Sequence, residues 1–208
     1  TPAPAPSPAP TPSPQPSPPG GGSGGHFYPL IAVARALRDL QAEEHIVDMK
    51  LTFMSDDPFD EGILREEDIS FEKVSSGKIR RYFSLRNIFS VPKMVLGIIK
   101  MLWRFAFEVP DVIFSKGGYA AFPVLVAARI YKIPVMIHES DSVPGKVNQW
   151  ASRFAKRVAI SFPESQSFFA EEKTALTGHP IRKGILGGTK EEALTLFQLE
   201  ETFPTLLV

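Results

Sequence analysis

The stretch GGGSGGHFYP at residues 20–29 has the composition of an anion-binding turn. Five of its first six residues are glycine, and a segment with helical spacing follows directly. A glycine turn that opens a helix leaves backbone N–H groups unpaired and brings the positive end of the helix dipole to one point. His26, at the exit of the turn, adds a side chain that can donate, accept or transfer a proton. These residues predict a phosphate site beside a group capable of acid–base chemistry.

Two further polar turns follow short apolar runs and could contribute to the same site. They are Lys116–Tyr119, after residues 111–115, and His138–Asn148, after residues 133–137. Ligands of parallel sheets bind beyond the carboxyl ends of the strands, so all three turns would open on that edge. Glu139 stands out among these residues because a carboxylate at a strand end is more often functional than part of a core.

The elements that must position these turns alternate between two periodicities. Apolar residues at 30, 33, 34, 37 and 40 share one helical face, whereas those at 47, 49, 51 and 53 alternate as in a strand. Further helices are expected at 60–67, 121–131, 146–155 and 190–199, further strands at 69–74, 111–115, 133–137 and 157–161, and a weak helix and strand within 163–176. This order predicts an α/β fold with a Rossmann-like parallel sheet flanked by helices and right-handed crossovers.

Residues 1–19 differ in composition from the rest of the chain. They alternate proline with small residues and contain ten of the twenty prolines. Proline lacks the N–H that a sheet ladder needs, so we expect an extended, solvated tail. We interpret this tail as a linker. The alternative is that it is a ligand for a domain that recognises proline-rich segments.

Composition narrows the class of protein. Basic and acidic residues balance at 23 each, so the chain has no net positive charge that would favour binding to nucleic acid. Cysteine is absent. Disulfides, thiolate metal sites and a cysteine nucleophile are therefore excluded, which fits a reducing cytoplasm. The four histidines are too scattered to predict a metal cluster, and no apolar run reaches the roughly 18–20 residues of a membrane span. Nor do we expect a signal peptide.

The segment Lys78–Phe107 is basic and rich in aromatic and aliphatic residues. It contains seven basic residues and no acidic one, and Pro92 is expected to divide it into a loop or short helix and a longer helix. Such a segment can lie in the interface of an anionic bilayer. A core helix with a solvated basic edge fits the residues equally well.

Four motifs together resemble the MurG family of bacterial peptidoglycan N-acetylglucosaminyltransferases, which belongs to glycosyltransferase family 28 with a GT-B fold. The matching pieces, in the order and approximate spacing of the family, are GGGSGGHFYP (20–29), SKGGYAAFPVLVAA (115–128), IPVMIHESDSVPGKVNQWASRFAKRVAISF (133–162) and TGHPIR (177–182). The resemblance implies a tail at 1–19, an acceptor-binding domain at 20–185, and a linker with the start of a truncated donor domain at 186–208.

The resemblance also implies an activity. Family members transfer GlcNAc from UDP-GlcNAc to the 4-hydroxyl of the MurNAc sugar of lipid I, with inversion and without a metal or other cofactor, and so form lipid II. The implied partners are UDP-GlcNAc, lipid I and the cytoplasmic face of the bacterial plasma membrane. The family docks there through an apolar patch ringed by basic residues, which favours the membrane interpretation of Lys78–Phe107. This chain alone is expected to be inactive without the donor domain.

Individual residues carry over at matching motif positions. His26 and Glu139 correspond to active-site residues, and His26 becomes the candidate for proton transfer or acceptor orientation. The residues that the resemblance places at the donor or the acceptor are Ser23, Gly24, Gly25, Gly117, Gly118, Tyr119, Asn148 and Arg182. Purely structural roles remain open for His26 at a helix start, Tyr119 in packing, Asn148 on a helix face and Arg182 at the surface.

Three features depart from the family. Asp141 stands where the family has the asparagine of its HEQN motif, as a further substrate-binding candidate. Its charge is unfavourable near a diphosphate unless it turns away, is protonated or acts as a base. His179 replaces the asparagine of a Gly-Asn-Pro motif, a milder change. The apolar strand that precedes the family's glycine turn has the proline tract in its place.

Two other hypotheses compete with the interpretation of this chain as a fragment of such a transferase. One is the membrane-side subunit of a split GlcNAc transferase, which would take its donor half from a partner. The other is a non-catalytic module at a membrane surface with a proline-rich arm, which would bind neither sugar nucleotide nor lipid acceptor.

Overall fold

The computed structural model describes residues 24–76, 86–181 and 187–198, without the side chains of residues 86–90. The order of elements is α1 (Phe27–Glu43), β1 (Leu51–Ser55), α2 (Glu61–Glu66), β2 (Ile69–Lys73), α3 (Arg86–Phe107), β3 (Ile113–Ser115), α4 (Ala121–Tyr131), β4 (Val135–Glu139), α5 (Lys146–Ala151), β5 (Arg157–Ile160), η1 (Pro163–Phe168), η2 (Glu171–Lys173), β6 (Thr174–Leu176) and α6 (Lys190–Phe197). The proline tract and the candidates Ser23 and Arg182 lie outside the described residues.

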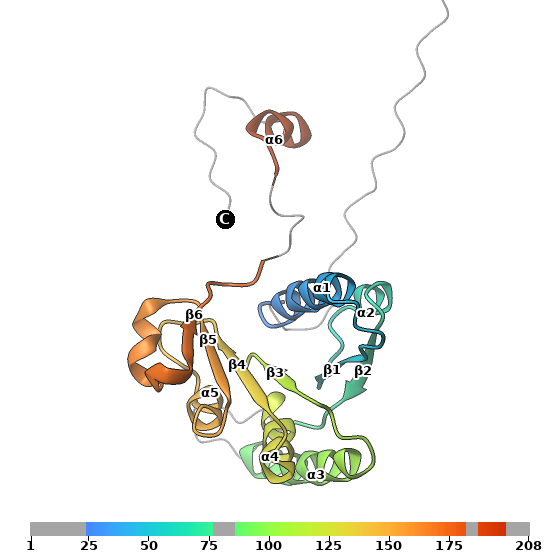
Figure 1. The fold of residues 1–208 in the computed structure, drawn as a ribbon, viewed down its shortest axis with the longest axis vertical. Coiled ribbons are helices and arrows are strands. Elements are labelled where there is room, and N and C mark those ends of the chain that lie inside the picture. The colour runs from blue at the N-terminus through green and yellow to red at the C-terminus, as the bar shows by residue number, and fades with distance from the viewer. Residues whose placement is uncertain (1–23, 77–85, 182–186, 199–208) are drawn as a thin grey trace, which may run out of the picture.

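All strands pair in parallel, which confirms the predicted α/β class. They form two sheets rather than one, with β1 paired to β2 and a second sheet in the order β3-β4-β5-β6. Figure 1 shows β1 facing β3 across the space between the sheets, with α1 and α2 beside the smaller sheet and α3 and α4 along the opposite side. The helices that connect successive strands therefore cover both faces, as parallel sheets require.

Two apolar clusters hold these layers together. The larger cluster joins α3, α4, α5 and the four-stranded sheet through buried residues such as Phe105, Leu125 and Ile137. The smaller cluster packs Phe27 and Ile31 of α1 against α2 and the two-stranded sheet. Met54 of β1 packs on the larger cluster and Phe53 on the smaller one, so β1 contributes to both.

Several boundaries differ from the sequence expectation. The strand predicted at 47–53 begins only at Leu51, and Val47 is 98% exposed. The first part of the alternating apolar pattern therefore lies before the strand. The expected apolar face of α1 was also misplaced, because Phe27 and Ile31 are the buried aliphatic and aromatic residues while Leu37 and Leu40 are exposed. The helix predicted at 146–155 ends at Ala151, where a tight turn leads into β5.

The prediction that Pro92 divides the basic segment is wrong. Helix α3 runs without interruption from Arg86 to Phe107 with Pro92 inside it. Proline removes one helical hydrogen bond and costs about 3 kcal/mol in a helix interior. Burial of Met94, Met101 and Phe105 along one face offsets this cost.

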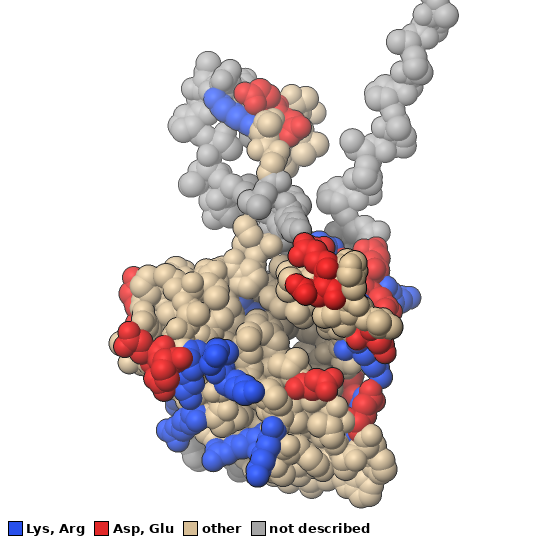
Figure 2. Space-filling view, viewed as in Figure 1, with Lys and Arg blue, Asp and Glu red and all other residues tan. Residues whose placement is uncertain are grey.

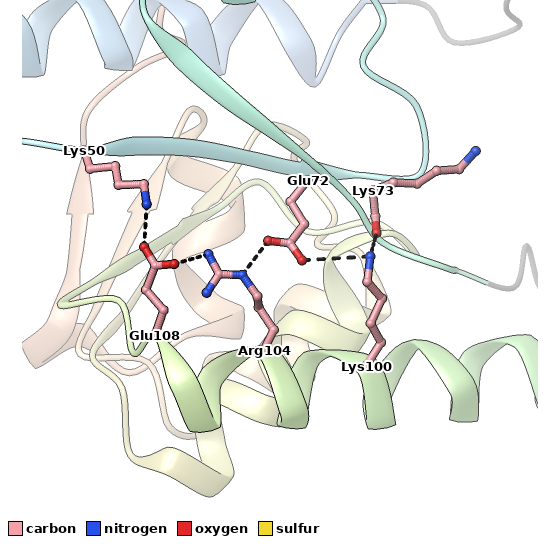
Figure 3. A network of polar contacts seen from close by, with 6 residues as sticks. All are labelled: Lys50, Glu72, Lys73, Lys100, Arg104 and Glu108. Carbon is pink, nitrogen blue, oxygen red and sulfur yellow. Dashed lines mark hydrogen bonds and ion pairs between the residues drawn. The ribbon is translucent and has the colours of Figure 1, made fainter.

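A chain of ion pairs holds α3 against β1 and β2 (Figure 3). Arg104 donates from Nε to Glu72 Oε2 at 2.8 Å and from Nη2 to Glu108 Oε2 at 2.5 Å. Lys50, directly before β1, reaches Glu108 Oε1 at 2.6 Å, and Lys100 lies 3.8 Å from Glu72 Oε1. The hydrogen bonds from Lys50 and Arg104 lower the pKa of Glu108. The carboxylates thus fix the orientation of α3 relative to the smaller sheet.

No helix in the described part of the chain combines the length and the apolar character needed to cross a bilayer.

Close packing of α3 against Ser75 and Pro123 depends on Gly97. A Cβ at this buried position would lie 2.0 Å from the backbone oxygen of Ser75 and 3.2 Å from Pro123 Cγ. Replacing Gly97 by alanine should therefore force α3 away from its neighbours and lower the free energy of unfolding by about 1–3 kcal/mol, measured by urea denaturation.

The matched control is Gly145→Ala, because nothing lies within 4 Å of the added Cβ and the backbone is extended there. This change should alter the free energy of unfolding by no more than about 0.5 kcal/mol. Equal stability of the two variants would contradict the packing described for α3.

Candidate functional site

The candidate site lies where β3, β4, β5 and β6 end and α1 begins. Gly24 and Gly25 lead into α1, and the peptide N–H of Tyr28 donates to Gly24 O at 3.0 Å to start the helix. His26 occupies the N-cap position of α1 and makes no capping hydrogen bond with its side chain, which is exposed. The imidazole is therefore available to a ligand at this end of the helix.

The turn after β3 packs tightly against α5. Gly117 donates its N–H to Ser115 Oγ at 3.0 Å and has a φ of +79°, a conformation that favours glycine. A Cβ at this position would lie 2.5 Å from Asn148 Oδ1. Gly118 follows with a φ of +83°, and Tyr119 begins the approach to α4 with 42% of its surface exposed.

The carboxylate of Glu139 is saturated by hydrogen bonds from the protein. Its Oε1 accepts from the N–H groups of Ser140 and Asp141 at 2.8 and 3.0 Å. Its Oε2 accepts from the Gly145 N–H at 3.1 Å and from Asn148 Nδ2 at 2.9 Å. Glu139 is only 4% exposed, so this buried carboxylate holds the loop 140–145 in place.

Asn148 lies beneath the site rather than at its surface, being 3% exposed. Besides Glu139, its amide nitrogen approaches the backbone oxygens of His138 and Lys116 at 3.3 and 3.5 Å. The amide thus connects the ends of β3 and β4. Its Oδ1 has no hydrogen-bond partner among the described residues and faces Gly117.

Lys116 was predicted only as part of the turn 116–119, and its individual place in the site was not. It is 5% exposed, and its Nζ donates to Ser140 Oγ at 2.5 Å. No carboxylate oxygen of the described residues lies within the 4.0 Å of an ion pair with this ammonium, and burial lowers its pKa. A cation directly after a predicted strand end, beside two glycines, was the signal available in the sequence.

The segment after β6 reaches the same edge through histidine contacts. His138 Nε2 lies 3.0 Å from Gly178 O, and its ring meets that of His179 edge to face at 6.0 Å between centroids. The Oγ of Ser161, directly after β5, lies 3.4 Å from His179 Nδ1. The motif TGHPIR at 177–182 thus reaches this edge through Gly178 and His179, and the described range ends at Ile181.

The surroundings of the site lower the pKa of its histidines. Desolvation by the surrounding protein lowers the pKa of His26 below its ordinary 6.5, and the positive charge of Lys116 lowers it further. Asp141 and Glu139 oppose this effect on His26. Burial is also the largest cause that lowers the pKa of His138 and His179, and Lys116 lowers both further; the hydrogen bond with Gly178 opposes the shift of His138. Neutral His26 can accept a proton.

The structure brings most of the predicted residues together at one edge. Those at the site are Gly24, Gly25, His26, Gly117, Gly118, Tyr119, Glu139, Asp141 and Asn148. The side chain of Asp141 is exposed while its N–H is held by Glu139. No group of three histidine or carboxylate side chains suited to a metal ion occurs within the described ranges.

The sequence and the fold of the chain are similar to those of known proteins. Residues 19–160 match the glycosyltransferase family 28 N-terminal domain. A UDP-N-acetylglucosamine--N-acetylmuramyl-(pentapeptide) pyrophosphoryl-undecaprenol N-acetylglucosamine transferase of Clostridium botulinum is 38% identical over 89% of this chain and 51% of its own length. The chain therefore spans about half the length of the relatives it matches.

Two solved structures share the fold. MurG of Acinetobacter baumannii superposes with a TM-score of 0.56 at 26% identity, over 77% of this chain and 43% of that one. UDP-GlcNAc 2-epimerase of Methanocaldococcus jannaschii, solved with UDP-GlcNAc and UDP, gives a TM-score of 0.52 over 74% of this chain and 44% of its own. At 14% identity the second likeness shows the fold alone. By its matching domain and its relatives, the chain belongs to glycosyltransferase family 28.

Proposed function

We propose that this chain is the acceptor-binding half of an inverting N-acetylglucosaminyltransferase that converts lipid I to lipid II. Its relative of Clostridium botulinum carries in its name both the UDP-GlcNAc donor and the pyrophosphoryl-undecaprenol acceptor. The observation that carries the proposal is the buried ammonium of Lys116, which has no carboxylate partner among the described residues, at the same strand ends as His26, whose pKa is lowered. One group suits a diphosphate, and the other suits a hydroxyl that must lose its proton.

The proposed reaction is a single displacement at the anomeric carbon of GlcNAc. The MurNAc 4-hydroxyl oxygen attacks this carbon from the face opposite UDP, a new C–O bond forms, and the bond to the UDP oxygen breaks. The hydroxyl proton passes to the imidazole of His26, and UDP leaves with the bonding electron pair. A positioned base of this kind contributes about 10²–10⁴ in rate.

The remaining residues position the reactants in this proposal. The N–H groups of the glycine turn, at the positive end of α1, and Lys116 face phosphate oxygens. Glu139 has no free lone pair aimed at solvent, since both oxygens are occupied, so we assign it to holding the loop 140–145 rather than to proton transfer. Ser23, Gly118, Tyr119, Asp141 and Arg182 stay candidates for substrate contact. A second domain would supply most of the UDP-GlcNAc site, and no metal is expected.

Contact with the membrane is proposed through the apolar stripe of α3. The stripe consists of side chains that are 46–80% exposed: Val91, Val95, Leu96, Ile99, Trp103 and Phe107. Lys93 and Lys100 lie on the same helix. The end of α4, with exposed Arg129 and Lys132, is adjacent to α3, because Tyr131 Oη donates to Leu102 O at 3.0 Å. Figure 2 shows basic side chains gathered over the region of α4 and α5, and acidic ones over α1. Apolar and basic groups side by side suit the cytoplasmic face of an anionic bilayer.

The role of His26 can be tested by its pH dependence. We expect His26→Ala to lower kcat for GlcNAc transfer to a lipid I analogue by about 10²–10⁴, with little change in KM. The protein to use joins this chain to the C-terminal half of the Clostridium botulinum relative. Because the pKa of His26 is lowered, its base function is present at neutral pH and is lost as the pH falls through a value below 6.5.

The variant should lack this acidic limb of the kcat profile. His45→Ala, a change at an exposed histidine just after α1, is the matched control and should leave both kcat and the profile unchanged. An acidic limb retained by His26→Ala would rule out His26 as the base.

The role of Lys116 can be tested by binding to the chain as it stands. Lys116→Met should weaken the affinity for a short-chain lipid I analogue by about tenfold or more, since a charge-assisted contact to phosphate is lost. Isothermal titration calorimetry provides the measurement. Lys146→Met, at the exposed start of α5, should change the affinity less than about twofold. Equal losses in the two variants would argue against a diphosphate contact at Lys116.

The membrane surface can be tested with vesicles that contain anionic phosphatidylglycerol. Trp103 and Phe107 stack with their ring centroids 5.8 Å apart, and serine at both positions should reduce vesicle binding by about tenfold or more in a sedimentation assay. The matched control replaces Phe162 and Phe168, two aromatic residues outside α3 that are each 48% exposed, by serine. These changes should not reduce vesicle binding. Unchanged binding of the α3 variant would refute this docking surface.

A further inference from the structure

The loop between β1 and α2 contains a strained residue. Phe59 has a φ of +60°, in a region that bulky side chains rarely adopt. The peptide N–H of Asp60 donates to Pro58 O at 2.7 Å, which closes a three-residue γ-turn with Phe59 at its centre. A γ-turn with positive φ is rare and costly in free energy, so a residue other than glycine is held there only by its surroundings.

Two aspartates fix this turn from both sides. Asp57 Oδ1 accepts from the N–H of Phe59 at 2.7 Å. Asp60 Oδ1 accepts from the N–H of Ile63 at 3.1 Å and so forms the N-cap of α2. Phe59 thus lies between two carboxylates that are each tied to the backbone, and its side chain leaves the turn in a defined direction.

The ring of Phe59 packs on the start of α1. Its centroid lies 4.9 Å from that of Phe27 and 5.6 Å from that of Tyr28, which it meets edge to face. A Cβ on Gly24 would lie 3.1 Å from Phe59 Cζ, and Gly24 itself is buried. The ring therefore borders the chain on both sides of His26, which stands between Gly24 and Phe27.

His26 depends on this backbone for its position. Its imidazole makes no capping hydrogen bond, and it takes part in no ion pair of the described residues. Lys116, Asp141 and Glu139, at the ends of β3 and β4, nevertheless act on it through their charges. The separation of the imidazole from these charges is therefore set by where the start of α1 lies.

Packing of the smaller cluster alone does not account for the conformation of Phe59. Phe71 belongs to the same cluster and lies within the regular strand β2. In the described part of the chain its one ring contact is with Phe53, at 6.3 Å between centroids. An aromatic side chain can therefore join this cluster from an unstrained backbone. The strained turn at Phe59 instead directs a ring to the start of α1.

We propose that Phe59 is a positioning residue for the candidate site. Its ring, aimed by the γ-turn, holds residues 24–28 and so keeps the imidazole of His26 at the ends of β3 and β4. The consequence for catalysis rests on the function proposed for His26 as the base. The positioning itself can be measured without any substrate.

The test is the titration of His26 in the whole 208-residue chain, followed by NMR of its ring protons. Phe59→Leu keeps the residue apolar and removes the ring. The start of α1 should then loosen, so that burial and the charge of Lys116 act less on the imidazole and its pKa rises towards 6.5. Phe59→Met, whose flexible side chain fills irregular gaps, should shift the pKa in the same direction with a smaller loss of stability.

The matched control is Phe71→Leu, which removes a ring from the same cluster and should leave the pKa of His26 unchanged. An unchanged pKa in both Phe59 variants would overturn the proposal. An equal rise in Phe71→Leu would do the same, because the effect would then belong to the cluster as a whole.

The effect on catalysis is measured in the protein that joins this chain to the C-terminal half of the Clostridium botulinum relative. Phe59→Leu should lower kcat by about tenfold or more with little change in KM, because catalytic groups are sensitive to small displacements. The acidic limb of the kcat profile should move to higher pH, since a base with a raised pKa is lost earlier as the pH falls. Phe71→Leu should change neither. A raised pKa of His26 with unchanged kcat would leave Phe59 as a positioning residue and would count against His26 as the base.

Discussion

The buried carboxylate of Glu139 is the interaction on which the candidate site depends. Four donors from the loop 140–145 and from Asn148 meet its two oxygens, and Asn148 in turn reaches the ends of β3 and β4. A buried charge is tolerated only when it is fully hydrogen-bonded, so the loop can adopt no other arrangement without exposing an unpaired carboxylate. Lys116 and Ser140 owe their relative placement to this constraint.

A second constraint connects the proposed membrane surface with the sheet edge. The buried face of α3 is fixed by Met101, Phe105 and the close approach at Gly97, and its polar margin is fixed by Arg104 between Glu72 and Glu108. The exposed apolar stripe therefore has a defined orientation relative to the strands. Docking through this stripe would set the distance between a bilayer and the strand ends where an acceptor head group would be held.

Much of the fold could be predicted from sequence, because most elements are short and bounded by clear turns. Alternating strands and helices identified the α/β class, and residues 121–131 were placed as a helix with the observed bounds. Pro92 misled the prediction because long-range burial outweighs a local helix breaker. The candidate site residues were predicted from motifs, but their hydrogen bonds were not. Lys116 and Ser140 are 24 positions apart in the chain, and the donors to Glu139 converge only once the loop 140–145 and α5 have folded around it.

The division of the strands into two sheets has a consequence for the assembly of the site. Strands β1 and β2 with α1 and α2 form a small cooperative unit that carries His26, whereas Lys116 and Glu139 belong to the larger unit. No backbone ladder joins the two units in the described residues, so side-chain packing and the α3 ion pairs carry the docking energy between them. A loss of this contact would separate His26 from Lys116 and Glu139 without breaking any strand pairing in either unit. A ligand that contacts both units would in turn stabilise their docking.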